Sequence, residues 1–511
     1  MIAQAGPGPA PHGHARPRAA PRGVCSGMDR THGQASDSPA SPVHLQLRTP
    51  ADVSPHDIPA RYLTEGTPGI GGQLRRHPED FIVEELPAYT PCGQGEHIYL
   101  YLQKVNMSTG HLVELVARHF SVPEEAVGYA GLKDKRAVTR QVISVHTPGK
   151  GIDDFGPLTH DRVQVLWADT HTNKLRRGHL RGNRFAIKVR SVPLSAVITA
   201  KRTLDALARS GVPNRAGEQR FGFFHNNHLL GRLLILGDWP GVIEELLRPR
   251  PAEDYPDGQT DPGQVEAREL FRRGLLAQAA RAMPAYAQTE AAVLAALARG
   301  QSPGRAIAAI GRRQRGFYVS AWQSAVFNAV LDRRLIDGTL GSLLRGDVAV
   351  KHDNGATFDV TEATAADPET RRRADQLAVS PTGPMWGHAM RRAAAGADEA
   401  ELAALAASGL SPEALAACAQ RSRSEAPPGD RRPLRVPLSY PEVEAGSDEH
   451  GLFVRCSFEL PAGSFATVVM GEVMKPDRPT PTPTLSPTLS PAHTHTPAAT
   501  PTPTPTPESP A

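Results

Sequence analysis

The sequence has few cysteines, no long apolar run and only a small excess of positive charge. Its 511 residues include four widely spaced cysteines with no Cys-x-x-Cys pair: Cys25, Cys92, Cys418 and Cys456. These are too few for the disulfide framework of a secreted protein, so the sequence predicts a reducing, cytoplasmic location. No apolar stretch approaches the roughly 18 residues that a membrane span needs, so we expect no membrane partner.

The motifs that hold metals and nucleotide cofactors are also missing. Histidines such as His97 and His111 are scattered, without the close pair and carboxylate typical of a zinc enzyme. Neither a phosphate-binding loop of the type Gly-x-x-x-x-Gly-Lys nor a dinucleotide loop of the type Gly-x-Gly-x-x-Gly occurs. We therefore expect no metal and no cofactor. Lys and Arg number 57 against 53 Asp and Glu, and this net charge of +4 is too slight to identify an anionic partner.

Proline and glycine, in contrast, are abundant, with 48 and 46 residues. Residues 1–59 are dominated by Pro, Gly, Ala, His, Ser and Arg without hydrophobic periodicity, and residues 476–511 consist largely of Thr-Pro repeats. Such segments bury too little apolar surface to offset the entropy lost on ordering. Both are predicted to be disordered tails.

Hydrophobic periodicity indicates an α+β block over residues 60–210. Two amphipathic helices are expected, at 108–120 and 194–210, with Ser108 capping the first and Gly211 ending the second. Strand-like runs lie at 81–86, 98–102, 142–145, 163–167 and 185–189.

Residues 211–434 are predicted to form a second, helix-rich domain. Helical apolar spacing occurs at 229–236, 241–247, 290–298 and 318–335, and residues 390–419 are typical of a surface helical pair. Strand-like alternation returns at 452–458, within residues 435–475. This order predicts that the helix-rich domain is inserted into the α+β block.

One aspartate lies among four basic residues in the segment 128–141 (GYAGLKDKRAVTRQ). Cations within about 4–6 Å keep a carboxylate ionised, which suits a nucleophile or general base in an anionic RNA or DNA site. Asp134 is therefore the candidate catalytic residue. Lys-Asp-Lys-Arg is also ordinary loop composition, so a solvated turn remains the alternative.

A second basic segment, residues 174–185 (KLRRGHLRGNRF), ends on an aromatic residue. Its cations suit backbone phosphates, and Phe185 could stack on an unpaired base, which is worth roughly 1–3 kcal/mol. A charged hairpin with Phe185 in the protein core is an equally good interpretation of the spacing.

These segments, together with further motifs in the same order, resemble the TruD family of tRNA pseudouridine synthases from about residue 71 to residue 475. The additional motifs are PEDFIVEE (78–85), GEH (95–97), GVPN (211–214), QRFG (219–222), SPTGPMWG (380–387) and LPAGSFAT (460–467). The resemblance implies a pseudouridine-synthase fold, a mixed sheet flanked by helices, with a family-specific domain inserted into it. It implies the isomerisation of uridine to pseudouridine in tRNA, at position thirteen, without a cofactor.

The resemblance also assigns roles to single residues. Asp134 occupies the position of the family's nucleophilic aspartate, Phe81, Asn183 and Phe465 fall on positions that contact the target nucleoside, and Phe185 lies close to the uracil ring. For the phosphates of tRNA we expect contacts from basic side chains of both segments: Lys133, Lys135, Arg136, Arg176 and Arg181.

Two departures from the family pattern are visible, and one alternative function is kept. Arg215-Ala216 stands where an aromatic pair is frequent, and Arg75 where some members have lysine. The alternative is a non-catalytic RNA-binding protein or RNA-folding chaperone on the same fold. Formation of pseudouridine would distinguish the two.

Overall fold

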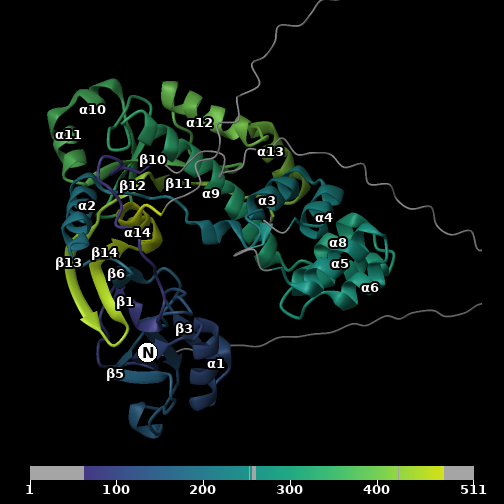
Figure 1. Ribbon diagram of the computed structural model, residues 1–511, viewed down its shortest axis with the longest axis horizontal. Coiled ribbons are helices and arrows are strands. Elements are labelled where there is room, and N and C mark those ends of the chain that lie inside the picture. Colours follow the sequence, from purple (N-terminus) through teal and green to yellow (C-terminus); the bar gives the residue numbers. More distant parts are fainter. Residues whose placement is uncertain (1–61, 252–253, 256–259, 424, 477–511) are drawn as a thin grey trace, which may run out of the picture. The chain divides into compact units, whose positions relative to one another are not determined.

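The computed structural model describes residues 62–251, 254–255, 260–423 and 425–476 (Figure 1). The predicted tails lie outside the described residues except for residue 476, and so does Cys25.

An eight-stranded mixed sheet is built from both ends of the described chain. Its strand order is β13-β14-β6-β1-β4-β2-β5, and β3 pairs with β4. β1 and β4 run parallel, and the other neighbours are antiparallel. The strands are β1 (Phe81–Pro87), β2 (His97–Val105), β3 (Val127–Tyr129), β4 (Val138–His146), β5 (Val163–His171), β6 (Leu180–Arg190), β13 (Ser439–Asp448) and β14 (Gly451–Pro461).

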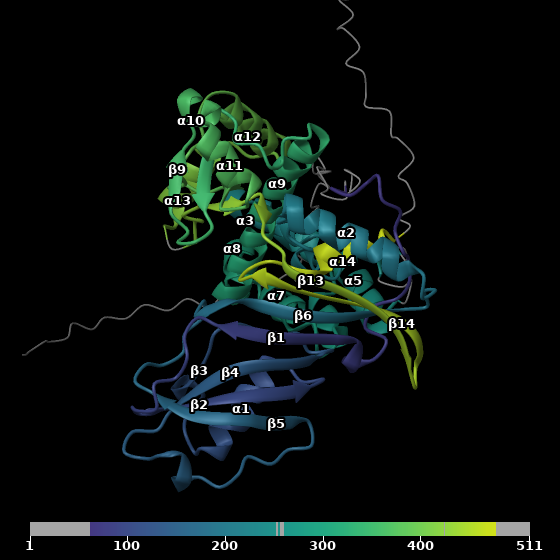
Figure 2. The same cartoon turned by 90° about the vertical axis from the view of Figure 1, so that its left-hand side faces the viewer.

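Helices cover the two halves of this sheet, whose strands lie side by side in Figure 2. α2 (Ala196–Ser210) and α14 (Ala466–Met474) bury apolar residues against the half that contains β1, β6 and β14, where Ile187, Leu204 and Val469 are fully buried. α1 (Thr109–His119) covers β2 and β4. The Ser108 side chain accepts a hydrogen bond from the His111 N–H, and Gly211 ends α2 with φ +82, so both predicted caps are confirmed.

The region between β6 and β13 is rich in helices, as predicted, and has its own apolar core around Leu230, Leu246 and Trp322. Its larger helices are α3 (Asn227–Leu236), α4 (Trp239–Leu247), α5 (Pro262–Arg272), α6 (Leu276–Ala282), α7 (Gln288–Ala298), α8 (Pro303–Ala308), α9 (Arg312–Ile336), α11 (Pro368–Asp375), α12 (Ala395–Ala407) and α13 (Pro412–Arg421). The short α10 (Glu362–Ala366) and the 3-10 helix η4 (Glu218–Phe221) complete it.

The expected helical pair corresponds to α12 and α13. Leu405 and Leu415 on these helices are buried in the core of the helix-rich region. Among the described residues no single helix is long and apolar enough to cross a membrane, and α12 with α13 meets that test only as a bent pair, by length and composition.

A second sheet in the helix-rich region was not expected from the sequence. It has the strand order β11-β10-β8-β9. These strands are β8 (Val348–Lys351), β9 (Thr357–Asp359), β10 (Val379–Met385) and β11 (Asp430–Pro433). The inner strand β10 has the sequence VSPTGPM. Proline and glycine are depleted in strands, so this sequence does not predict a strand.

The two connections between the sheet domain and the helix-rich region pair with each other in a separate two-stranded sheet. β7 (Val212–Pro213) pairs with β12 (Arg435–Val436), close to the expected domain boundaries at residues 211 and 434. β14 then pairs with β6, with Phe458 opposite Phe185, and thereby extends the sheet that residues 81–190 began. The division into residues 60–210, 211–434 and 435–475 stays a prediction.

Candidate active site

Asp134 lies in the loop between β3 and β4, with its side chain 35% exposed. Its Oδ1 is 3.2 Å from Nη2 of Arg75, a residue 59 positions earlier in the chain. Arg75 has a φ of +57 and places its guanidinium 4.2 Å from the centre of the Phe81 ring. The carboxylate is thus held by a charge-assisted hydrogen bond, while the side chain remains partly exposed to solvent.

Lys133 does not occupy the position that the sequence suggested. Its Nζ lies 2.5 Å from Oε2 of Glu85, and the two side chains are only 4% and 1% exposed. A buried lysine in a close ion pair is not available to an RNA phosphate. If Lys133 turned towards a phosphate, the buried carboxylate of Glu85 would lose its counter-charge, which is energetically unfavourable. We therefore correct the prediction that Lys133 contacts a phosphate: its ion pair with Glu85 anchors the Asp134 loop to β1.

Lys104, which the sequence analysis did not single out, lies under the same loop. Its ammonium donates to the backbone oxygens of Met107, at 2.6 Å, and of Asp134, at 3.0 Å. Burial lowers the pKa of Lys104 to about 8, although the charge of Asp134 opposes this shift. The available signal was that Lys104 continues the alternation of the apolar residues Ile98, Leu100 and Leu102 in the sequence of β2.

Buried polar atoms without partners gather on neighbouring strands beside the loop. Glu85 of β1 lies opposite Asn183 of β6 in the sheet, and Glu85 Oε1 accepts from the Val142 N–H of β4 at 3.2 Å. Within the described part of the chain, Asn183 Oδ1, Thr139 Oγ1 and Gln141 Nε2 are buried without a hydrogen-bond partner. Each such atom costs roughly 1–3 kcal/mol, which is typical of a place where a ligand supplies the missing partner.

Three of the predicted substrate contacts are aromatic, and the structure places them at different depths. Phe81 and Phe185 are 1% and 6% exposed, with ring centres 6.5 Å apart, so Phe185 is part of the core. Phe465 is half-buried at the N-terminus of α14, where its side chain caps no backbone group. Phe465 is the aromatic residue of the three that is partly open to a ligand.

The two basic segments of the sequence lie against each other. The Gly178 N–H donates to the Ala130 carbonyl at 2.8 Å, and the Leu175 N–H donates to Ser144 Oγ at 3.0 Å. A Cβ on Gly128 would lie 2.3 Å from the Leu175 oxygen, so this close approach requires glycine. The cations that remain exposed on these segments and at their ends include Lys135, Arg136, Arg176 and Arg181.

The unusual Arg215-Ala216 pair is accommodated by α9. Arg215 forms an ion pair with Asp332, and Ala216 exchanges two backbone hydrogen bonds with the side chain of Asn328, at 2.9 and 3.0 Å. Residues 215 and 216 are thus anchored to α9 by polar contacts.

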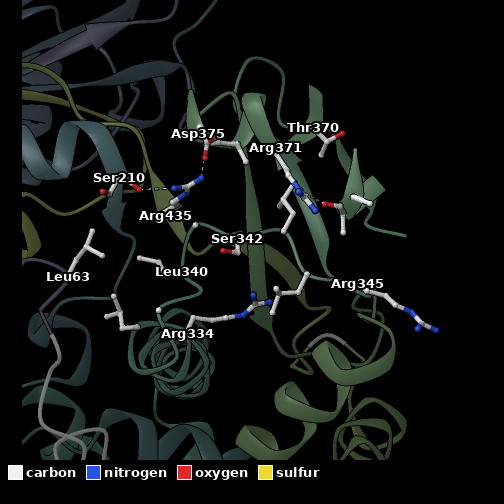
Figure 3. Close-up of a pocket in the computed structure, with 18 of the residues that line it drawn as sticks. Leu63, Ser210, Arg334, Leu340, Ser342, Arg345, Thr370, Arg371, Asp375 and Arg435 are labelled. Carbon is white, nitrogen blue, oxygen red and sulfur yellow. Dashed lines mark hydrogen bonds between the residues drawn. The ribbon is translucent and has the colours of Figure 1, made fainter. Parts of the chain in front are cut away.

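The large hollow in Figure 3 lies apart from these residues. It has a volume of about 920 Å³ and is lined by five arginines: Arg209, Arg334, Arg345, Arg371 and Arg435. The C-terminal turns of α2, α9 and α11 also line it. Arg435 donates to the carbonyls of Ser210 and Ala374 in two of these turns, at 2.9 and 2.7 Å (Figure 3). Cations are favourable at helix C-termini, so this cluster has a structural explanation.

No cluster of three or more His, Cys, Asp or Glu side chains that could hold a metal ion is found among residues 62–476 as far as they are described.

Comparisons with known proteins identify the family and the fold. Residues 57–473 match the family model of tRNA pseudouridine synthase D (TruD). The chain belongs to the TruD family. It is 42% identical to tRNA pseudouridine synthase D of Geobacter sulfurreducens over 429 residues, which are 82% of this chain and 97% of the relative. Identity to the protein of that name from Syntrophotalea carbinolica is 40%, over 82% of this chain and 100% of the relative.

A solved structure from Methanosarcina mazei, assigned to tRNA pseudouridine synthase D, has the same fold. The two structures superpose with a TM-score of 0.68 at 27% sequence identity, over 82% of this chain and 97% of that one. The mixed α+β architecture is therefore that of the TruD family.

Proposed function

We propose that this protein isomerises uridine to pseudouridine in tRNA, with Asp134 as the catalytic residue. The observation that carries the proposal is a partly exposed aspartate held by Arg75 beside buried, unpaired polar atoms. Membership of the TruD family supplies the substrate class. A non-catalytic RNA-binding protein would have no use for a carboxylate in this position.

The reaction breaks the N1–C1′ bond, rotates the uracil and joins C5 to C1′, while the proton of C5 is lost and N1 gains one. Nothing is oxidised or reduced, so the side chains present can serve without a redox cofactor. The Asp134 carboxylate either attacks C1′ or removes a ribose proton to give a glycal-like intermediate. Both routes use a carboxylate oxygen of Asp134, whose side chain is 35% exposed.

The other predicted residues bind and hold the substrate. The target nucleotide must leave the RNA stack, which costs a few kcal/mol. Lys135, Arg136, Arg176 and Arg181 are exposed and offset this cost by contacting phosphates. Asn183 hydrogen-bonds the base or ribose through its side-chain amide, whose Oδ1 has no partner within the described residues. Phe465 packs against the nucleoside.

The buried aromatic residues act from below the nucleoside. Phe81 supports Arg75 through the contact of its ring with the guanidinium. Phe185 packs edge-on against Phe81, and together the two rings form the buried layer beneath the proposed position of the uracil.

Two finer features of the function rest on the resemblance alone. We infer that position thirteen of tRNA is the modified uridine and that the enzyme works in the cytoplasm. Mapping of the modified position in tRNA from cells with and without the gene tests the first, and fractionation of those cells tests the second.

The test of the reaction compares Asp134→Asn with Asp161→Asn, an exposed aspartate in the turn before β5. We expect Asp134→Asn to lower turnover of unmodified tRNA by more than about a thousandfold and to leave tRNA binding largely intact. Mass spectrometry after pseudouridine-specific derivatisation measures the product. Substantial product from Asp134→Asn would exclude the assignment, and no product from the unaltered chain would favour the RNA-binding alternative.

A further inference from the structure

Two arginines of the helix-rich region flank α9 without an acidic partner. Arg220 of η4 donates to Ser320 Oγ at 3.0 Å and lies 5.4 Å from the centre of the Phe317 ring. Arg432 of β11 lies 5.4 Å from the centre of the Phe327 ring, farther along the same helix. Both residues are half-buried.

Neighbouring arginines show how unusual this arrangement is. Arg431 forms a buried, two-fold ion pair with Glu401, with both side chains 4% exposed, and Arg215 pairs with Asp332. Among the described residues, no Asp or Glu forms an ion pair with Arg220 or Arg432. Burial lowers the pKa of both groups, to about 10 for Arg432, where repulsion by Arg220 adds to the effect.

The hydrogen bonds of Arg432 leave its charge uncompensated. Its guanidinium donates to Oδ1 and the backbone oxygen of Asn214, at 2.6 and 3.2 Å, and to the backbone oxygen of Gly463, at 3.0 Å. These acceptors are neutral. Two cations that repel each other in a half-buried position are unfavourable unless an anion binds between them or beside them.

The pair borders the candidate active site. Gly463 precedes Ser464 and Phe465 in the loop that enters α14, and Ser464 Oγ is buried without a partner among the described residues. A Cβ on Gly217, directly before η4, would lie 3.4 Å from Thr467 Oγ1 in the first turn of α14. Arg432 therefore contacts the Phe465 loop directly, and η4, which carries Arg220, begins beside the first turn of α14.

We propose that Arg220 and Arg432 together bind one phosphodiester group of the RNA next to the target uridine. A guanidinium offers a planar fork of donors that fits phosphate oxygens, and a phosphate would supply the missing negative charge. Because Arg432 also holds Gly463, the bound phosphate is linked directly to the loop that carries Phe465. This inference rests on the proposed function, since it takes tRNA as the ligand.

The experiment measures the binding of unmodified tRNA transcript to the full chain at several salt concentrations. The variants are Arg220→Gln and Arg432→Gln, each with its charge-keeping counterpart Arg220→Lys or Arg432→Lys. Arg333→Gln is the matched control, because Arg333 lies on α9, is 69% exposed and pairs with Asp337. All variants carry Asp134→Asn, so binding is measured without turnover.

We expect each glutamine variant to weaken binding about tenfold at low salt. The slope of log K against log salt should become shallower by about 0.7–0.9, the value for one lost phosphate contact. The lysine variants should keep the slope of the parent, and so should Arg333→Gln. A purely structural role would weaken binding without changing the slope.

An unchanged slope in Arg220→Gln would overturn the proposal, and so would an equal change in Arg333→Gln. Arg220→Gln decides the question if Arg432→Gln fails to fold, because the Arg220 side chain makes a single hydrogen bond, to Ser320, among those found. Failure of the proposed function shows separately, as an absence of pseudouridine from the unaltered chain.

Discussion

The Asp134 site and the large hollow of Figure 3 both contain many polar and charged side chains, but they differ in which of these groups lack a hydrogen-bond partner. Around the hollow, Arg435 donates to carbonyls at the ends of two helices, and Arg334 pairs with Asp347 through Nη2, while its Nη1 is buried without a partner in the described structure. Beside Asp134, Asn183 Oδ1 and Thr139 Oγ1 are buried without partners in the described structure. The unpaired groups beside Asp134 are neutral side chains of neighbouring strands in one sheet, and we expect them to mark the substrate site.

The largest expected effect separates folding from activity at the hollow. Arg435→Met should lower the free energy of unfolding by about 2–4 kcal/mol, because two backbone carbonyls, one in a buried and one in a part-buried hydrogen bond, lose their donor. Turnover per folded molecule should stay unchanged. Urea denaturation and a pseudouridine assay measure the two quantities, and a loss of turnover without a loss of stability would place the hollow within the active site.

At Asn183 we expect a loss of activity with little loss of stability. Asn183→Ala should lower kcat/KM about 10- to 100-fold, equivalent to about 1.4–2.7 kcal/mol, since the amide contacts the nucleoside. Its stability should hardly fall, because Oδ1 has no partner to lose in the described structure. Asn354→Ala, in an exposed turn, is the control. If Asn183→Ala were as active as this control, the unpaired oxygen would not mark the substrate site.

Burial of Lys104 beneath the Asp134 loop should make the free energy of unfolding depend on pH. Its pKa is about 8 in the folded chain against an ordinary 10.5, so between these values the unfolded chain keeps a proton that the folded chain has released. The free energy of unfolding should therefore rise with pH, by about 2 kcal/mol between pH 8 and pH 10, and should gain nothing from this group below pH 8.

The matched variant Lys104→Met should lack this rise. Urea denaturation of both proteins from pH 7 to pH 10 measures the difference. Subtracting one stability curve from the other removes the contributions of all other groups that titrate in this pH range. Parallel stability curves would mean that Lys104 keeps its ordinary pKa despite its burial.

The smallest effect concerns the exposed cations. Lys135→Gln should weaken tRNA binding a few-fold and make its salt dependence shallower by about 0.7–0.9. Lys201→Gln is the control, because Lys201 is exposed on α2 and pairs with Asp205. Equal salt dependence of the two variants would show that the loop of Asp134 does not face the RNA backbone.

The sequence by itself determined the features that depend on neighbouring residues. Ser108 specifies the start of α1 through its side chain, which accepts from a backbone N–H, and Gly211 specifies the end of α2 through its positive φ. The segment around Asp134 and the order of the motifs were sufficient to recognise the TruD family, which the comparisons confirmed. Alternation at 452–458 identified the returning strand β14.

The tertiary structure decided which partners these residues have. The cation that holds Asp134 is Arg75, and Lys133 next to Asp134 turns to Glu85. The strand β10 forms despite its two prolines because β8 and β11 pair with it. Such contacts join residues far apart in the chain, and they are set by the register of the sheets and by burial, which no local pattern of residues encodes.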